Sequence, residues 1–120
     1  MEIRNVLERL KLLTNDDRED LLLMLSGDAV QRLKARLCCT EEEENAHEEA
    51  LCAAAAAQAA YQFWLLEEAA SPKSLTAGEV RAEFDKGSER ALAYAKQCER
   101  AVSGLLHDED FYFGVTENTV

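Results

Sequence analysis

The sequence predicts a mainly α-helical protein, a small bundle of four to five helices. Apolar residues recur at three- and four-residue spacing through most of the chain, which is the period of a one-faced helix. One proline, Pro72, and five glycines interrupt the 120 residues, so long helices are permitted almost everywhere. The hydrophobic fraction of 48% is enough for one core. We therefore expect one helical domain over residues 1–110 and a C-terminal arm over 111–120.

The first forty residues predict two helices. Over residues 2–13, five apolar side chains fall on one face: Ile3, Val6, Leu7, Leu10 and Leu13. A stop and a new N-cap follow at residues 14–17, because short polar side chains satisfy the free backbone N–H groups of a helix start. A second helix is expected over residues 17–38, with acids at its start and bases near its end, as the helix dipole favours. Gly27 costs about 1 kcal/mol relative to alanine inside a helix, so it marks either a kink or a break into two shorter helices.

The middle of the chain predicts a close-packed central helix. Thr40 and Glu43 have the spacing of a capping box, in which each side chain accepts from the backbone N–H of the other residue. The alanine-rich run that follows has high helix propensity, and its small side chains let another helix approach closely. Trp64 is expected in the core, and Pro72 ends the helix because the residue before proline avoids the helical region.

A change of character follows at residues 72–87, the one segment where β structure is left open. We expect a long loop or a short β-hairpin there, because apolar residues alternate with polar ones around Gly78. A final helix is expected over residues 88–106, beginning at Ser88. Its apolar face consists of Leu92, Ala95, Cys98, Val102, Leu105 and Leu106.

Charge is distributed unevenly along the chain. Residues 1–39 carry seven acids and seven bases, whereas residues 40–71 carry eight acids and no bases, within a net charge of −11. Phosphate binding needs clustered Lys and Arg, so we expect no direct sequence-specific nucleic-acid binding and no docking on anionic lipid. The longest apolar run falls short of the roughly 20 residues that cross a bilayer, so no membrane association is expected.

No complete catalytic or metal-binding motif is present. Glu44 and His47 have one Glu-x-x-His spacing, but a ferritin-like site needs two, and Gly104 stands where the partner of His107 would be. No nucleophile elbow, phosphate-binding loop or dinucleotide fingerprint occurs. Four residues are expected to be free thiols: Cys38, Cys39, Cys52 and Cys98. We therefore expect no enzyme activity, no catalytic residues, no metal and no cofactor.

Apolar side chains outside the expected helices are the candidates for a protein interface. They are Leu75, Val80, Phe84, Phe111, Tyr112 and Phe113. Aromatic residues are enriched among interface anchors, and a chain end is mobile unless something holds it. Two interpretations remain open: these side chains pack on their own core, or they dock on another subunit.

Several stretches together resemble a known family. A short N-terminal helix pair, the run AAAAAQAAYQFWLL, the linker SLTAGEVRAEFD, a last helix and the ending LLHDEDFYFGV resemble the small head–tail connector (adaptor) proteins of long-tailed phages and prophages. The resemblance covers most of the chain through short motifs. It implies a structural subunit that forms a homo-oligomeric ring between the portal of the DNA-filled head and the head-completion or tail proteins. The expected location is the virion neck, or the bacterial cytoplasm when the protein is expressed from a prophage.

The same resemblance assigns roles to particular segments. Residues 72–87 would be a loop that reaches a neighbour or the portal, and residues 111–115 would be a docking arm. DNA would pass through the ring, and acids facing that channel would repel phosphate: Glu41, Glu42, Glu43, Glu44, Glu48 and Glu49. Two other classes stay open. One is a cytoplasmic acidic helical adaptor or regulator that binds a basic protein, and the other is a small enzyme or metal protein on a helical bundle.

Overall fold

The computed structural model describes the backbone of residues 1–70 and 78–107, and the side chains of residues 1–70 and 87–107. Within these ranges the chain forms five α-helices and one short 3₁₀ helix. They are α1 (Ile3–Thr14), α2 (Glu19–Arg36), α3 (Glu41–Ala46), α4 (Glu48–Ala70), α5 (Gly78–Ala101) and η1 (Ser103–Leu105). The described residues contain no strand, only an isolated antiparallel bridge between Leu37 and Leu106. The predicted small helical bundle is confirmed.

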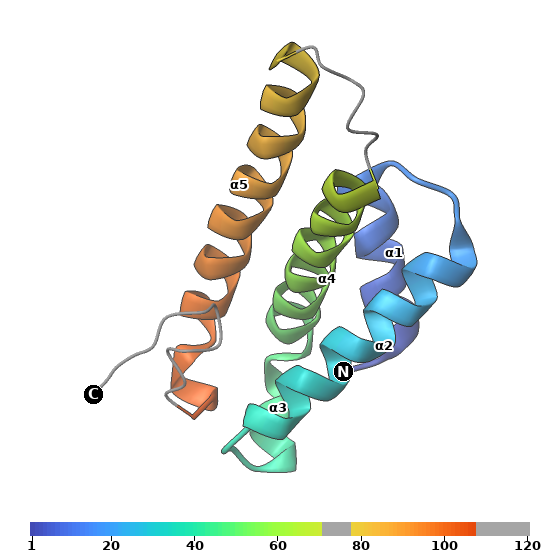
Figure 1. Cartoon of the computed structure of the whole chain (residues 1–120). Coiled ribbons are helices and arrows are strands. Elements are labelled where there is room, and N and C mark those ends of the chain that lie inside the picture. The colour runs from blue at the N-terminus through green and yellow to red at the C-terminus, as the bar shows by residue number, and fades with distance from the viewer. Residues whose placement is uncertain (71–77, 108–120) are drawn as a thin grey trace.

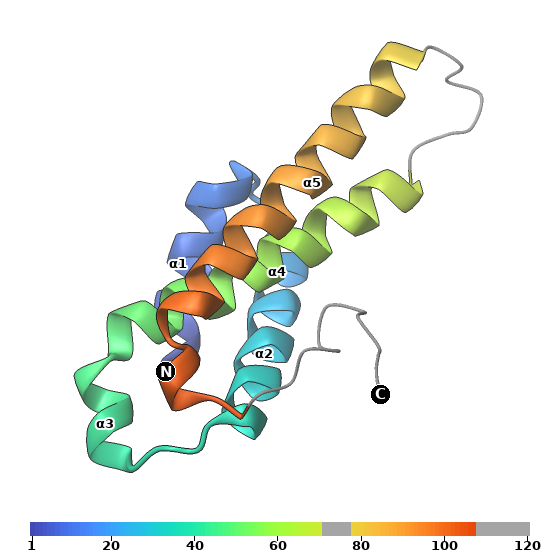
Figure 2. The same ribbon diagram turned by 90° about the vertical axis from the view of Figure 1, so that its left-hand side faces the viewer.

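The helices are arranged around α4, which packs against α1, α2 and α5 (Figure 1). α5 runs antiparallel to α4 on one side, and α1 and α2 pack on the other. In the second view, α1 and α2 emerge on opposite sides of the α4–α5 pair (Figure 2). The short helix α3 lies at the end of the bundle where α4 begins.

The core is built from large side chains of α1 and α2 against the small side chains of α4. Val6, Leu10 and Leu22 are fully buried, as are Ala55 and Ala56 of α4. Alanine allows this because its methyl group leaves room for a leucine from the facing helix. Burying each leucine contributes about 1.5–3 kcal/mol. The alanine run predicted to be a close-packed central helix is therefore central, as expected.

Aromatic residues close the opposite end of the same core. Phe63 is buried, and its ring meets that of Trp64 edge to face with 5.3 Å between centroids. Trp64 is half-buried and packs against the core cluster rather than inside it. The guanidinium of Arg18 lies 5.5 Å from the Phe63 ring centroid and 2.8 Å from Glu67, so the α1–α2 connection is attached to α4.

Gly27 does not break the second helix, because α2 continues through it from Glu19 to Arg36. A methyl group added to Gly27 would meet no atom within 4 Å. The cost of glycine in a helix is smaller than the stabilisation from the buried face of α2. The separation between α1 and α2 is as predicted, and Asn15 ends α1 in the left-handed conformation with φ 54°.

The capping box at Thr40 is confirmed, but the helix that it begins is short. The Thr40 hydroxyl accepts from the Glu43 N–H at 3.1 Å, and the Glu43 carboxylate accepts from the Thr40 N–H at 3.0 Å. The expectation of one helix running from this cap is wrong, because α3 ends at Ala46 and α4 begins at Glu48. At the interruption, the His47 ring nitrogen Nδ1 lies 2.9 Å from the Glu43 carbonyl oxygen. A local side-chain bond of this kind competes with regular helix geometry.

The final helix begins ten residues earlier than predicted and ends at Ala101, before η1. Residues 78–87 are helical, so both the long loop and the β-hairpin are wrong for them, and residues 71–77 lie outside the described range. Gly87 lies inside α5, and a methyl group there would be 3.2 Å from Trp64 Cε3. The glycine therefore serves close packing between α4 and α5, not a chain turn.

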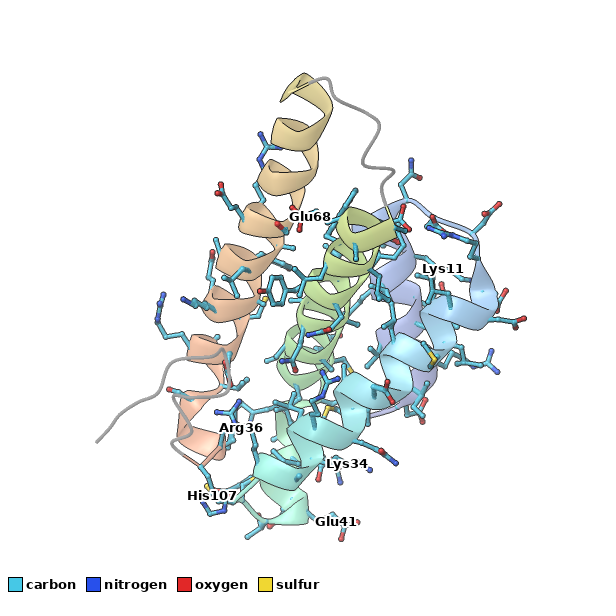
Figure 3. The ribbon with its side chains drawn as sticks, viewed as in Figure 1. Lys11, Lys34, Arg36, Glu41, Glu68 and His107 are labelled. Carbon is cyan, nitrogen blue, oxygen red and sulfur yellow. The ribbon has the colours of Figure 1, made fainter. Side chains whose placement is uncertain are left out.

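Residues after α5 are attached to the C-terminal end of α2. The Cys38 N–H donates to the Leu105 carbonyl at 2.9 Å, and the His107 N–H donates to the Arg36 carbonyl at 2.8 Å. Arg36 also pairs with Glu99 of α5 and donates to the His107 carbonyl. Arg36 and His107 lie together at one end of the bundle (Figure 3). The last described residue is therefore fixed beside α2.

Candidate interaction surfaces

An apolar groove, here called the α1–α5 groove, is open on one side of the bundle. Its volume is about 220 Å³, and it is lined by Arg9, Leu12 and Leu13 of α1, Ala53 and Ala56 of α4, and Tyr94 of α5. α1 and α5 form the two walls, and α4 forms the floor. Of the two floor alanines, Ala53 is half-buried, whereas Ala56 is fully buried beneath the surrounding side chains.

The walls of the groove are unusually exposed for apolar residues. Leu12 is 84% exposed, while Leu13 and Tyr94 are 38% and 41% exposed. α1 already buries Val6 and Leu10 on its core face. A helix turns about 100° per residue, so Leu12 falls outside that face. Apolar side chains gathered around a concave apolar floor are typical of binding sites.

Arg9 is the one charged residue among those that line the groove. The hydrogen bond with Cys98 is the largest cause that raises the pKa of Tyr94, followed by the charge of Cys98 and by burial, whereas Arg9 acts in the opposite direction. The phenol therefore stays protonated and neutral around pH 7. The groove offers an apolar floor, a neutral aromatic wall and a single cation.

The acidic end of the bundle contains the second surface, where two of the predicted channel-facing acids have partners within the fold. Glu44 and Glu48 lie 3.2 and 3.0 Å from the Met1 amine. Glu48 also accepts from the Glu2 N–H at 3.1 Å and from the Cys52 thiol at 3.3 Å. The hydrogen bond from the amine lowers the pKa of Glu48, against the opposing effect of burial. These two carboxylates attach the chain start to α3 and α4.

The remaining acids of this set differ in their surroundings. Glu43 is exposed and belongs to the capping box, so its carboxylate also acts within the fold. Glu41, Glu42 and Glu49 are exposed on the first turns of α3 and α4. Glu41 lies at the end of the bundle, pointing away from it (Figure 3). Three of the six predicted acids therefore form a solvent-facing anionic surface, here called the acidic end.

None of the predicted interface side chains can be placed. Leu75, Phe111, Tyr112 and Phe113 lie outside the described residues, and Val80 and Phe84 lie in α5 where only the backbone is described. The residues that line the groove were not predicted as interface candidates. One signal was available for Leu12, which is a leucine outside the apolar stripe of its helix. Nothing in the sequence brings Tyr94 next to α1, because that neighbourhood depends on how α5 packs on α4.

The four cysteines are free. Burial is the largest cause that raises the pKa of the Cys52 thiol, followed by its hydrogen bond with Glu48, and desolvation raises the pKa of Cys39. Both thiols are thereby held in the protonated form, which is the less nucleophilic one. Within the described side chains, no three His, Cys, Asp or Glu residues gather in a way that could hold a metal ion.

Across the described residues, no helix combines the length and the apolar character that a membrane crossing requires. Comparison with family models, with curated proteins and with solved structures finds no match to this chain.

Proposed function

We propose that this protein is a structural subunit of a phage or prophage head–tail connector, which assembles into a ring between the portal and the head-completion or tail proteins. The observation that carries the proposal is the α1–α5 groove, with Leu12 84% exposed beside an alanine floor. A surface of this kind favours contact with another protein chain. The resemblance of the sequence motifs to the connector family supplies the particular assembly.

A second uncovered apolar pair supports assembly through more than one face. Leu23 and Met24 of α2 are 47% and 54% exposed. α2 packs beside α1, which carries the groove, and in the view of Figure 2 the two helices emerge in different directions from behind α4. Subunits of a ring need two different contact surfaces, because each surface meets a different one on the next copy and the rotation closes the circle. Two separate apolar surfaces, on α1 and α2, suit that requirement.

The acidic end is assigned to the DNA channel in this proposal. Glu41, Glu42 and Glu49 are exposed, and the stretch 40–71 contains no base. Carboxylates facing the channel repel the phosphates of passing DNA, so the genome moves through without adhering. Glu44 and Glu48 are excluded from this role because they pair with the Met1 amine.

Electron microscopy of the purified protein, alone and mixed with the portal protein of the same genome, tests the proposal. We expect closed rings, with subunits stacked on the portal in the mixture. In three dimensions the acidic end should line the central opening. A protein that stays monomeric under both conditions, or a ring with the acidic end on its outer rim, contradicts the proposal or its channel assignment respectively.

The alternative is an acidic helical adaptor that binds one basic protein. The exposed acids Glu41, Glu42 and Glu49 favour it, because their charge is available for pairing with Lys or Arg. The two functions differ in salt dependence. Binding through exposed charges weakens strongly as ionic strength rises, whereas ring contacts through apolar surfaces do not. A salt-sensitive one-to-one complex, lost in a Glu41→Gln, Glu42→Gln and Glu49→Gln variant, would establish the adaptor.

A further inference from the structure

We propose that the α1–α5 groove receives residues 108–113 of a neighbouring copy of this chain, an inference that rests on the proposed ring assembly. The residues that line the groove define which chemical groups it can bind. Its floor is made of the alanine methyl groups of Ala53 and Ala56, its apolar walls are Leu12 and Tyr94, and Arg9 is its one cation. Such a site fits an aromatic ring with a carboxylate beside it.

The segment 108–113 has that composition. Its sequence is Asp-Glu-Asp-Phe-Tyr-Phe, and no other segment of the chain places three acids next to three aromatics. An aromatic ring can lie on the alanine floor with its edge toward Tyr94, the geometry that aromatic pairs prefer. A carboxylate from the acidic part can accept from the Arg9 guanidinium, a charge-assisted bond that gains strength at the edge of an apolar site. Shape and charge therefore both match.

The position of the chain end indicates a neighbour rather than the same copy. His107 is bonded to Arg36 at the end of α2, and in the view of Figure 2 that end of α2 and α1, which carries the groove, emerge on different sides of α5. Phe113, the last aromatic of the segment, is the sixth residue after His107, so the segment reaches at most ~21 Å from it. To enter its own groove the segment must pass around α5, a path of roughly 16–19 Å along half the circumference of a helix about 10–12 Å across, and climb about 12 Å from Val102 to the level of Tyr94. Six residues cannot cover both distances along that path.

The contact joins two different surfaces, so it is heterologous. Each copy gives one segment and receives one, which leaves no copy saturated until the chain of subunits closes on itself. The groove and the segment together would be sufficient to define a direction around the ring. Leu12 is predicted to be the apolar anchor of the receptor, because it is the most exposed large apolar side chain among the described residues.

A labelled peptide of residues 107–116 tests the receptor directly. It is titrated into full-length protein carrying Phe111→Ser, Tyr112→Ser and Phe113→Ser, so that neighbouring segments do not compete, and binding is followed by fluorescence anisotropy. Adding Leu12→Glu should weaken binding at least tenfold, about 1.4 kcal/mol, because a carboxylate then lies in the apolar wall. Adding Leu23→Glu is the matched control and should leave the affinity unchanged. Circular dichroism checks that both variants remain folded.

Two results would overturn the receptor assignment: no binding of the peptide up to about 1 mM, or equal binding with and without Leu12→Glu. Electron microscopy of full-length protein with Leu12→Glu separates this failure from failure of the ring. Intact rings in that variant would leave the connector function standing and reject the groove. Peptide binding at the groove without rings in the wild-type protein would keep the receptor and reject the connector.

Discussion

Side chains of neighbouring helices cover the alanine surface of α4 fully in one region and only partly in another. Where α1 and α2 pack on it, Leu10 and Leu22 are fully buried against the alanine run. Where α1 and α5 diverge over it, Ala53 and Ala56 form the floor of the α1–α5 groove and Leu12 remains 84% exposed. The same helix and the same residue type give a closed core in one region and an open receptor in the other.

This difference shows that the neighbouring helices, rather than the alanines themselves, determine how each region of α4 is covered. Alanine offers little area of its own, so the stability of each region comes from the larger side chains that the neighbouring helices place over it. α2 places leucines directly on α4. At the groove, the leucines of α1 stand at the side of the floor, which leaves Ala53 half-buried although Ala56 is fully buried. We propose binding at the α1–α5 groove, because another protein chain can place its side chains against α4 there.

The largest expected effect is on the free energy of unfolding, when a leucine is removed from the covered region of α4. Leu22→Ala should reduce the free energy of unfolding by about 2–5 kcal/mol, because it removes a fully buried side chain and leaves a cavity. Leu12→Ala is the matched change on the uncovered side and should alter stability by no more than about 0.5 kcal/mol. Urea unfolding followed by circular dichroism measures both. Equal losses would mean that Leu12 is already covered within one copy.

The covered region also contains a polar group that weakens it. Ser26 of α2 is fully buried, and its hydroxyl has no hydrogen-bond partner among the described residues. Ser26→Ala should raise the free energy of unfolding by about 1–2 kcal/mol, because it removes an unsatisfied buried hydroxyl and favours the helix. Thermal unfolding should show a higher Tm. A lower Tm would indicate that the hydroxyl has a partner after all.

Gly27 and Gly87 allow an outward-facing helix position to be compared with a close-packed one. Gly27→Ala should stabilise the protein by about 1 kcal/mol, because the added methyl meets nothing within 4 Å and alanine favours the helix. Gly87→Ala should give a smaller gain or a loss, because its methyl would stand 3.2 Å from Trp64 Cε3. Chemical denaturation of the two variants side by side measures the difference. A Gly87 variant as stable as the Gly27 variant would show that Trp64 moves freely.

These glycines also show how far the sequence could predict the fold. Helical periodicity, the cap at Thr40 and the alanine run are local signals, and they gave the helical class, the α1–α2 division and the central position of α4. The start of α5 was predicted wrongly at Ser88, and the contact that Gly87 makes possible with Trp64, 23 residues earlier in the chain, could not be predicted from local sequence. The groove could not be predicted for the same reason. Leu12 is visible as an exposed leucine, but Tyr94 joins it only through the packing of α5 on α4.

The smallest expected effect concerns the acidic end, where pairing distinguishes Glu48 from its exposed neighbours. The Glu48 pKa lies below its ordinary 4.5, chiefly because of the hydrogen bond from the Met1 amine. Burial acts to lower the amine pKa, but the hydrogen bonds to Glu48 and Glu44 outweigh it and raise that pKa above 8.0. The carboxylate therefore contributes stability above about pH 4.5 that is lost as pH falls through its folded pKa. The amine contributes stability below pH 8.0 that is lost as pH rises through its own folded pKa.

Glu48→Gln should therefore lower the free energy of unfolding by about 0.5–1 kcal/mol between these limits, an amount reduced by solvent screening. The variant and the wild type should differ less as pH falls through the folded pKa of Glu48 or rises through that of the amine, because one member of the pair then loses its charge. Glu42→Gln is the control, since Glu42 is exposed and belongs to the proposed channel surface. Urea midpoints across this pH range measure the effect. A Glu42 variant with the same pH dependence would show that the whole acidic end, rather than the pair with Met1, carries the charge-dependent stability, and Glu48 would then return to the set of residues available to a partner.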